Sequence, residues 1–384
     1  MDFSFTEEQQ AIRETAQRFA RDRIALDYKK REEAGCLNRR TMREMGELGL
    51  IGADLPEEYG GLGTDAVTAG IVIEAIAHAD LSLSYVQLSN GLMGRIIAGH
   101  GQPEVARELI PRMTGGEIIV GLGLTEPRGG SDAAGLVVKA SRNGENYVLS
   151  GEKTSASAAD QSEHMVVLAR TGTVEQGAGG VTAFVVPLDS PGVNLSRIDD
   201  VGTVAIGRGS VFFDDVQVPE RLRLGGEGDG FRLIMNGFDY SRALIGLQCL
   251  GPARASLEET WEYVTQRQAF DKPIATYQGV TQPLAEAETL MEAARLLCYK
   301  TLWLRDRGLP HTAEAAMCKW WVPQVTFDII QRCLITHGHY GYAKDLPHQQ
   351  RLRDVLGLQI GDGTEQIQKM VIAREKIGRV AVPY

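Results

Sequence analysis

The sequence is poor in cysteine, lacks long apolar runs and has no excess of positive charge. Its 384 residues include five cysteines and carry a formal net charge of −10 at pH 7. The odd number of scattered cysteines, with no CxxC pair, argues against a disulfide framework and favours buried thiols in a reducing compartment. A strongly acidic chain binds nucleic acid poorly, because neutralisation of phosphate charge dominates that affinity. No stretch reaches the ~18 uninterrupted apolar residues that a membrane-spanning helix needs.

The N-terminal segment, MDFSFTEEQQAIRETAQRFA, does not look like a targeting peptide. It carries acidic residues early and has no long apolar run, unlike a signal peptide or an arginine- and serine-rich transit peptide. We therefore expect a cytoplasmic protein, and a trimmed organellar form stays open as the alternative. The composition, 43% hydrophobic and 23% charged, is ordinary for a folded globular protein.

The spacing of apolar residues changes twice along the chain. Residues 1–115 show helical periodicity, and Thr6 with Gln9 forms a capping-box pattern. Residues 116–226 give short strand-like runs between glycines, which is typical of a compact antiparallel β domain. Residues 227–384 return to long amphipathic helices, which predict an antiparallel bundle. The expected fold class is α+β, with an N-terminal helical domain, a middle antiparallel β domain and a C-terminal four-helix bundle.

The β region begins with glycines that do not form a dinucleotide-binding fingerprint. The sequence Gly121-Leu122-Gly123 lacks the third glycine and leads to Pro127 rather than to a helix. The alternating strand–helix rhythm of the dinucleotide-binding fold is missing too. A redox cofactor, if there is one, must therefore bind in another way.

The segment 121–135, GLGLTEPRGGSDAAG, is a better candidate for ligand binding. Gly129 and Gly130 let the backbone approach a ligand closely. The hydroxyls of Thr125 and Ser131 can bond to carbonyl or phosphate oxygens. From the residue types alone, a plain polar hairpin loop is the competing interpretation.

A series of short motifs is spaced along nearly the whole chain. They are PEEYGGLG (56–63), TEPRGGSD (125–132), SGEK (150–153), VFFDDVQVP (211–219), GFDYSR (237–242), RQAFDKPI (267–274) with Gln278, GHYGY (338–342), RLRD (351–354) and GDGTEQIQKMVIARE (361–375). Taken together and in this order, they resemble the acyl-CoA dehydrogenase family, although each motif alone is weak. The resemblance implies that family's fold, FAD as cofactor, an acyl-CoA thioester as substrate, electron-transfer flavoprotein as acceptor and a homotetramer built as a dimer of dimers.

The resemblance also implies which residues bind the cofactor and the substrate. Thr125 would hydrogen-bond to the pyrimidine side of the flavin, and Ser131 would lie by the pyrophosphate and the pantetheine chain. Arg267 would reach the FAD of a neighbouring subunit, since guanidinium pairs well with phosphate; an exposed helix arginine is the alternative. The implied cofactor residues are Leu122, Leu124, Thr125, Gly130, Ser131, Ser155, Ser157, Arg267, Phe270, Gln278, Gly338, Thr364 and Gln366, and the implied substrate residues are Ser131, Asp239, Arg242, Gly361 and Gly363.

The position of the family's catalytic base carries an aspartate in this chain. The family motif Tyr-Glu-Gly-Thr, whose Glu is the base, is replaced by Gly361-Asp362-Gly363-Thr364. The resemblance thus assigns the base to Asp362, whose side chain is shorter by roughly 1.5 Å. Burial would have to raise its pKa above the free value of ~3.9 for it to remove an α-proton acidified by the thioester. From the local pattern alone, Asp362 merely caps a helix that starts near Thr364.

Two further departures from the family occur near the expected flavin. Where the family has Trp-Ile-Thr, this chain has Ser155-Ala156-Ser157. Ser157 keeps a hydroxyl near flavin N5, whereas Ser155 loses the indole and Gly361 loses the tyrosine ring. These losses predict a wider cavity at the reacting carbons. We therefore expect a substrate that is bulky at Cα, such as a cyclohexanecarboxyl-CoA type of thioester.

The predicted reaction is an α,β-dehydrogenation. Asp362 takes the α-proton and the β-hydride passes to flavin N5, while the backbone N–H of Asp362 and a flavin hydroxyl hold the thioester carbonyl. Two alternatives stay open: an oxidase of a non-CoA carbon acid such as a nitroalkane on the same fold, and a degenerate FAD-binding structural subunit. His337 and His339 have no third ligand at a convincing spacing, so we expect no metal site.

Overall fold

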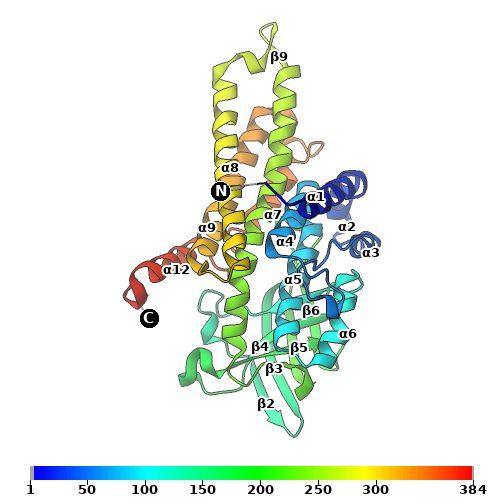
Figure 1. Ribbon diagram of the computed structural model, residues 1–384, viewed down its shortest axis with the longest axis vertical. Helices are drawn as coiled ribbons and strands as arrows, with labels where there is room; N and C mark the ends of the chain where they lie inside the picture. The colour runs from blue at the N-terminus through cyan, green and yellow to red at the C-terminus, as the bar shows by residue number, and fades with distance from the viewer. Residues whose placement is uncertain (1–3, 383–384) are drawn as a thin grey trace.

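The N-terminal part of the chain is helical in the computed structural model, which describes residues 4–382 (Figure 1). The first helix begins with the predicted capping box, in which Thr6 and Gln9 bond to each other's backbone N–H. Asp65 and Asp80 cap the N-termini of two buried helices, because their carboxylates accept hydrogen bonds from backbone N–H groups of the first turn. These helices are α1 (Glu7–Phe19), α2 (Tyr28–Ala34), α3 (Arg39–Glu47), α4 (Ala66–Ala79), α5 (Leu81–His100) and α6 (Pro103–Thr114).

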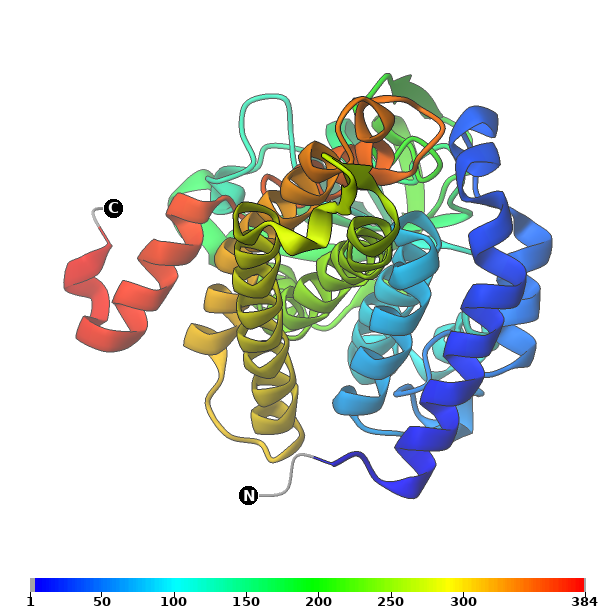
Figure 2. The same ribbon diagram turned by 90° about the horizontal axis from the view of Figure 1, so that it is seen from above.

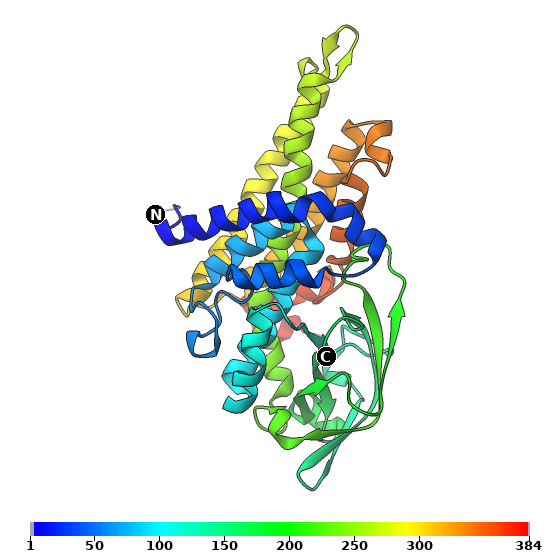
Figure 3. The same cartoon turned by 90° about the vertical axis from the view of Figure 1, so that its right-hand side faces the viewer.

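The middle part of the chain forms one twisted sheet below the helices (Figure 3). Its order is β6-β7-β3-β2-β4-β5-β8, with β1 paired to β4. The sheet is antiparallel as expected, except that β1 and a single residue pair of β2 run parallel to β4. Its strands are β1 (Val120–Gly123), β2 (Lys139–Asn143), β3 (Asn146–Ser157), β4 (His164–Arg170), β5 (Val181–Pro187), β6 (Val193–Ile198), β7 (Arg208–Pro219) and β8 (Arg223–Leu224).

The C-terminal part is a bundle of long helices around α7 (Gly230–Gln266). The central helix α7 packs on α4, α5, α8 and α9, so it joins the two helical parts. A short hairpin, β9 (Gln268–Ala269) and β10 (Lys272–Pro273), connects α7 to α8 at the end of the molecule farthest from the sheet (Figure 1). The other helices are α8 (Gln278–Asp306), α9 (Thr312–Thr336), α10 (His339–Tyr342), α11 (His348–Gly357) and α12 (Glu365–Ile377), of which α12 leans away from the body (Figure 2).

Asp354 on α11 joins all three parts of the chain. Its buried carboxylate accepts a hydrogen bond of 2.7 Å from the hydroxyl of Tyr28 on α2. It also accepts one of 2.6 Å from the backbone N–H of Thr203, in the loop between β6 and β7. A buried polar contact of this kind orients the parts specifically, because each group loses a partner if the parts separate.

The structure confirms the predicted α+β class with its helical, β and helical parts. Helix α7 is much longer than the helical run from Arg254 that the sequence pattern predicts, because it begins at Gly230 and continues through Pro252. No helix in the range 4–382 is long and apolar enough to cross a membrane. The domain boundaries at residues 115 and 226 stay predictions.

Candidate active site

Asp362 lies in the loop between α11 and α12, in a backbone conformation that is rare for its residue type. Its φ angle is +55°, and the next residue, Gly363, has a φ angle of +96°. Left-handed backbone at a non-glycine residue costs free energy and persists only where the surroundings hold it. The surrounding fold therefore fixes the direction of the half-buried Asp362 side chain.

Side chains from α5, α7 and α9 surround the Asp362 carboxylate. Burial raises its pKa above the usual value, while the positive charges of Lys319 and Arg242 and a hydrogen bond from Ser241 act in the opposite direction. Tyr85 on α5 is close enough that the charge of Asp362 helps to raise the pKa of its phenol. A carboxyl with a raised pKa is suited to accept a proton.

The interpretation of Asp362 as a helix cap is wrong. Helix α12 begins at Glu365, its N-cap residue is Thr364, and no side chain caps it. Asp362 contributes its backbone instead: its carbonyl accepts a hydrogen bond of 2.9 Å from the side-chain amide of Gln368. The carboxylate is left for other chemistry.

The predicted flavin residues of the sheet lie side by side. The carbonyl of Thr125 accepts a hydrogen bond of 2.9 Å from the N–H of Thr154, which brings the segment after β1 against the end of β3. Ser157 ends β3, and its carbonyl accepts a hydrogen bond of 3.2 Å from the Tyr85 hydroxyl. Because Tyr85 is also near enough to feel the charge of Asp362, the structure brings the Thr125 and Ser157 segments and the candidate base to one place.

The residues at this place fit a flavin. Leu122, Leu124, Thr125 and Ser157 are half-buried, and Ser131 is exposed. Among the described residues, no hydrogen bond engages the hydroxyls of Thr125 and Ser131, while the side chain of Ser157 lies close enough to hydrogen-bond to Tyr85. Partly exposed apolar surface beside available hydroxyls is what a planar ring with polar edges needs. Their individual contacts with FAD stay predictions.

Asp239 and Arg242, the predicted substrate residues on α7, form an ion pair of 3.0 Å. The hydroxyl of Thr312 donates a second hydrogen bond, of 2.6 Å, to the Asp239 carboxylate. The guanidinium is buried, yet its Nε has no hydrogen-bond partner within the range 4–382. A buried unpaired donor is costly, so this nitrogen is available to an acceptor on a ligand.

Ser155 takes part in a contact that the sequence did not suggest. Its φ angle is +58°, and its hydroxyl accepts a hydrogen bond of 2.8 Å from the guanidinium of Arg208 on β7. Arg208 also pairs with the carboxylate of Asp200. At this position we expected only that the family's indole is missing. The structure shows that Ser155 instead forms a hydrogen bond with Arg208.

The remaining predicted cofactor residues fall into two groups. Thr364 and Gln366 lie two and four residues after Asp362, and the predicted substrate residue Gly361 precedes it. Arg267, Phe270 and Gln278 instead lie on or beside the exposed hairpin between α7 and α8, which is far from α12, and Gly338 lies at the exposed turn after α9 (Figure 1). The structure does not bring this second group to the base within one chain. Their role toward a neighbouring subunit stays a prediction.

Lys319, Ser241, Tyr85 and Gln368 were missed as members of the site. Ser241 and Gln368 lie within the motifs 237–242 and 361–375, but the resemblance assigned them no role, and Tyr85 and Lys319 lie outside all of the motifs. Lys319 did leave one trace: it is a lone cation on the buried face of α9. A charged residue at such a position is rarely buried without a partner.

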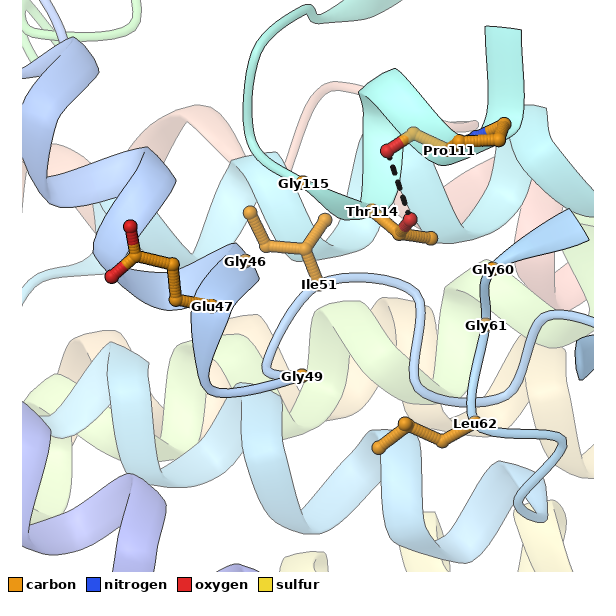
Figure 4. A pocket seen from close by; sticks show the side chains of 10 residues that line it. All are labelled: Gly46, Glu47, Gly49, Ile51, Gly60, Gly61, Leu62, Pro111, Thr114 and Gly115. Carbon is orange, nitrogen blue, oxygen red and sulfur yellow. Dashed lines mark hydrogen bonds between the residues drawn. The ribbon is translucent and has the colours of Figure 1, made fainter. Parts of the chain in front are cut away.

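A hollow of about 310 Å³ in the N-terminal helical part is separate from this site (Figure 4). Pro111, Thr114 and Gly115 line it at the end of α6, together with the glycines and aliphatic side chains of the segments 46–51 and 60–62. Glu47 is its only charged lining residue. It offers no group of residues suited to catalysis.

Comparisons with known proteins agree with this architecture. Family models for the N-terminal, middle and C-terminal domains of acyl-CoA dehydrogenases match residues 6–117, 121–216 and 228–377. The chain is 34% identical to benzylmalonyl-CoA dehydrogenase of Aromatoleum aromaticum, over 98% of this chain and 99% of that protein. It is 31% identical to a caffeyl-CoA reductase–Etf complex subunit of Acetobacterium woodii, over 96% and 98% of the two chains.

A solved structure of a glutaryl-CoA dehydrogenase from Mycobacterium smegmatis, in complex with FADH2, superposes with a TM-score of 0.91. The two chains are 25% identical, and the match covers 97% of this chain and 95% of the other. Family models and full-length relatives thus agree with the helical, β and helical parts of the fold. The chain belongs to the acyl-CoA dehydrogenase family and is an FAD-dependent oxidoreductase.

Proposed function

We propose that this enzyme dehydrogenates acyl-CoA thioesters whose acyl group is α-branched or alicyclic, of the cyclohexane-1-carboxyl type. The observation that carries the proposal is a half-buried Asp362 with a raised pKa, beside a position without a side chain, Gly361. Asp362 is the base that removes the α-proton. FAD supplies the acceptor for the β-hydride when it is bound, and the segments at Thr125 and Ser157 hold it.

The space beside the base favours a bulky acyl group. A Cβ atom added at Gly361 would meet only the carbonyl of Gly357, at 4.0 Å. A side chain therefore has room at this position, and its absence leaves that room to the substrate. The aspartate withdraws the carboxylate by about one C–C bond relative to the family's glutamate, which suits a substituted α-carbon.

Asp239 and Arg242 on α7 favour a CoA thioester as the substrate over a smaller carbon acid. An oxidase of a nitroalkane needs no site for a long, polar CoA chain. The Asp239–Arg242 pair, with its unpaired Arg242 Nε, provides polar groups beside Asp362 for such a ligand. A structural subunit without activity would not need an acid that the fold holds with a left-handed backbone and a raised pKa.

We further propose a cytoplasmic homotetramer, a dimer of dimers, that passes electrons to an electron-transfer flavoprotein. Arg267 and Gln278 are exposed and flank the hairpin of β9 and β10, which is far from α12, as expected for residues that serve a neighbouring subunit. Phe270 at the tip of the hairpin is 91% exposed, which suggests that another chain covers it. The name of the Acetobacterium woodii relative refers to a complex with Etf.

An anaerobic titration of the purified FAD enzyme tests the proposal. Cyclohexanecarboxyl-CoA, a branched acyl-CoA, butyryl-CoA, octanoyl-CoA and a nitroalkane are added in turn, and bleaching of the flavin absorbance is followed. We expect the alicyclic thioester to reduce the flavin fastest. Faster reduction by a straight-chain thioester would contradict the substrate class, and reduction by the nitroalkane alone would contradict the CoA thioester.

A further inference from the structure

Lys319 on α9 is almost completely buried, with 1% of its surface exposed. Burying an ammonium group is expensive unless hydrogen bonds or charges compensate for the lost water. Its environment must therefore compensate, and none of the ion pairs among residues 4–382 includes it. Helix packing alone does not explain why this charged side chain is buried inside the bundle.

The hydrogen bonds of Lys319 go to both sides of the loop that carries Asp362. Its Nζ donates a hydrogen bond of 2.7 Å to the carbonyl of Leu358, just after α11. It donates a longer one, of 3.4 Å, to the carbonyl of Gly363, just before α12. One ammonium group therefore links the two ends of the loop that carries Asp362.

Gln368 on α12 supports the same loop from the other side. Its side-chain amide donates to the carbonyls of Asp362, at 2.9 Å, and Gly363, at 3.3 Å. Because Asp362 has a left-handed backbone, its conformation must be held by surrounding contacts. Lys319 and Gln368 are the side chains that bond to the loop carbonyls at this point.

The charges around Lys319 also point to Asp362. Burial lowers the pKa of Lys319 to about 8, whereas the neighbouring Asp362 and Cys249 raise it and Arg242 lowers it. The ammonium form therefore dominates at neutral pH. Arg242 and Ser241 of α7 also act on Asp362, and the charge of Asp362 acts in turn on Tyr85 of α5.

We propose that Lys319 is the positioning residue of the base, holding the Asp362 loop closed and supplying the counter-charge that favours the carboxylate. This inference rests on the proposed function of Asp362. Without the ammonium charge, the buried carboxyl keeps its proton to higher pH, so fewer molecules have a competent base near neutrality. The loss is greatest on the acid side of the pH profile, where wild-type Asp362 is only partly ionised.

The main test is the rate of flavin reduction in the anaerobic FAD-loaded enzyme as a function of pH. Lys319→Met removes both the charge and the hydrogen bonds, while Lys319→Gln keeps a donor and removes only the charge. We expect both to move the acid limb to higher pH by about one unit or more. Lys319→Arg keeps the charge, so the acid limb of its pH profile should lie close to that of the wild type.

Lys369→Met is the matched control. Lys369 lies on α12, is half-exposed and pairs with Glu365, so its removal changes the total charge equally but in contact with water. Its profile should coincide with that of the wild type. An unshifted acid limb in Lys319→Gln, whatever the plateau rate, would overturn the inference, and so would an equal shift in Lys369→Met.

A second measurement separates this inference from the proposed function. The carboxyl band of Asp362 is titrated by infrared difference spectroscopy of the FAD enzyme without substrate, with Asp362→Asn subtracted. In Lys319→Gln the band should persist to higher pH than in the wild type; an unchanged titration overturns the role of Lys319. If no acyl-CoA reduces the wild-type flavin, the proposed function fails, while this titration still decides the role of Lys319.

Discussion

The phenol of Tyr85 donates a hydrogen bond of 3.2 Å to the backbone carbonyl of Ser157. This contact joins α5 to the end of β3 at the point where the resemblance places the reactive part of the flavin. Burial, together with the charge of Asp362, raises the pKa of Tyr85 to about 12, so the phenol stays neutral. The candidate active site therefore draws on all three parts of the chain.

Replacing Asp362 by Asn tests the base directly. The amide has nearly the same shape but cannot accept the α-proton, so we expect flavin reduction by the best acyl-CoA to fall by at least about a hundredfold. FAD should stay bound, which the flavin absorbance of the purified variant reports. A variant that reduces its flavin at the wild-type rate would remove Asp362 from the mechanism.

The same substitution should change how stability depends on pH. The pKa of Asp362 in the folded protein is raised above 3.8, its value in the unfolded chain. Its contribution to the stability of the fold is therefore complete at pH values below the unfolded-state pKa. The contribution is lost as the pH rises through the folded-state pKa. Asp362→Asn avoids this loss and should melt at a higher temperature than the wild type at neutral pH. The difference should shrink toward acid pH in thermal melts. A destabilised variant at neutral pH would contradict this account.

Filling the space beside the base should narrow the choice of substrate. Gly361→Tyr adds a side chain at a position where an added Cβ meets no atom nearer than 4.0 Å, so the backbone leaves room for its first atom. We expect the ratio of rates with cyclohexanecarboxyl-CoA and butyryl-CoA to fall by about tenfold, since the ring competes with the bulky acyl group. Gly357→Ala, at a position with nothing within 4 Å, is the control and should leave the ratio unchanged.

A buried ion pair holds the predicted flavin segment against the sheet. Lys153 on β3 donates to the Glu126 carboxylate at 2.8 Å and to the Leu124 carbonyl at 3.1 Å. Glu126 in turn accepts from the backbone N–H groups of Val137 and Val138. Lys153→Met leaves the carboxylate unpaired, which should cost about 3–5 kcal/mol in the free energy of unfolding and weaken FAD binding.

Denaturant unfolding and FAD titration measure the two effects of Lys153→Met. Lys153→Met combined with Glu126→Gln should recover part of the stability, because neither charge is then left unpaired. Arg142→Met breaks the exposed pair with Glu220 and should cost only about 0–1 kcal/mol. Equal losses in the buried and the exposed variant would refute the ion-pair explanation.

Much of the fold followed from local patterns. The helix from Glu7 was predictable because its capping box is contained within a few residues. The extent of α7 was not, because Pro252 normally interrupts a helix, and only packing on α4, α5, α8 and α9 explains why it continues. The parallel pairing of β1 with β4 also depends on contacts between distant segments, which no local pattern encodes.

The sequence by itself determined the helical, β and helical order, the family resemblance and the aspartate at position 362. Only the tertiary structure decided that Lys319 and Tyr85 surround this aspartate, because they come from helices far apart in the chain. It also decided that Asp362 does not cap α12. Residue type and spacing report what a segment can form, whereas the pKa of a carboxyl depends on burial and on charges that folding brings near it.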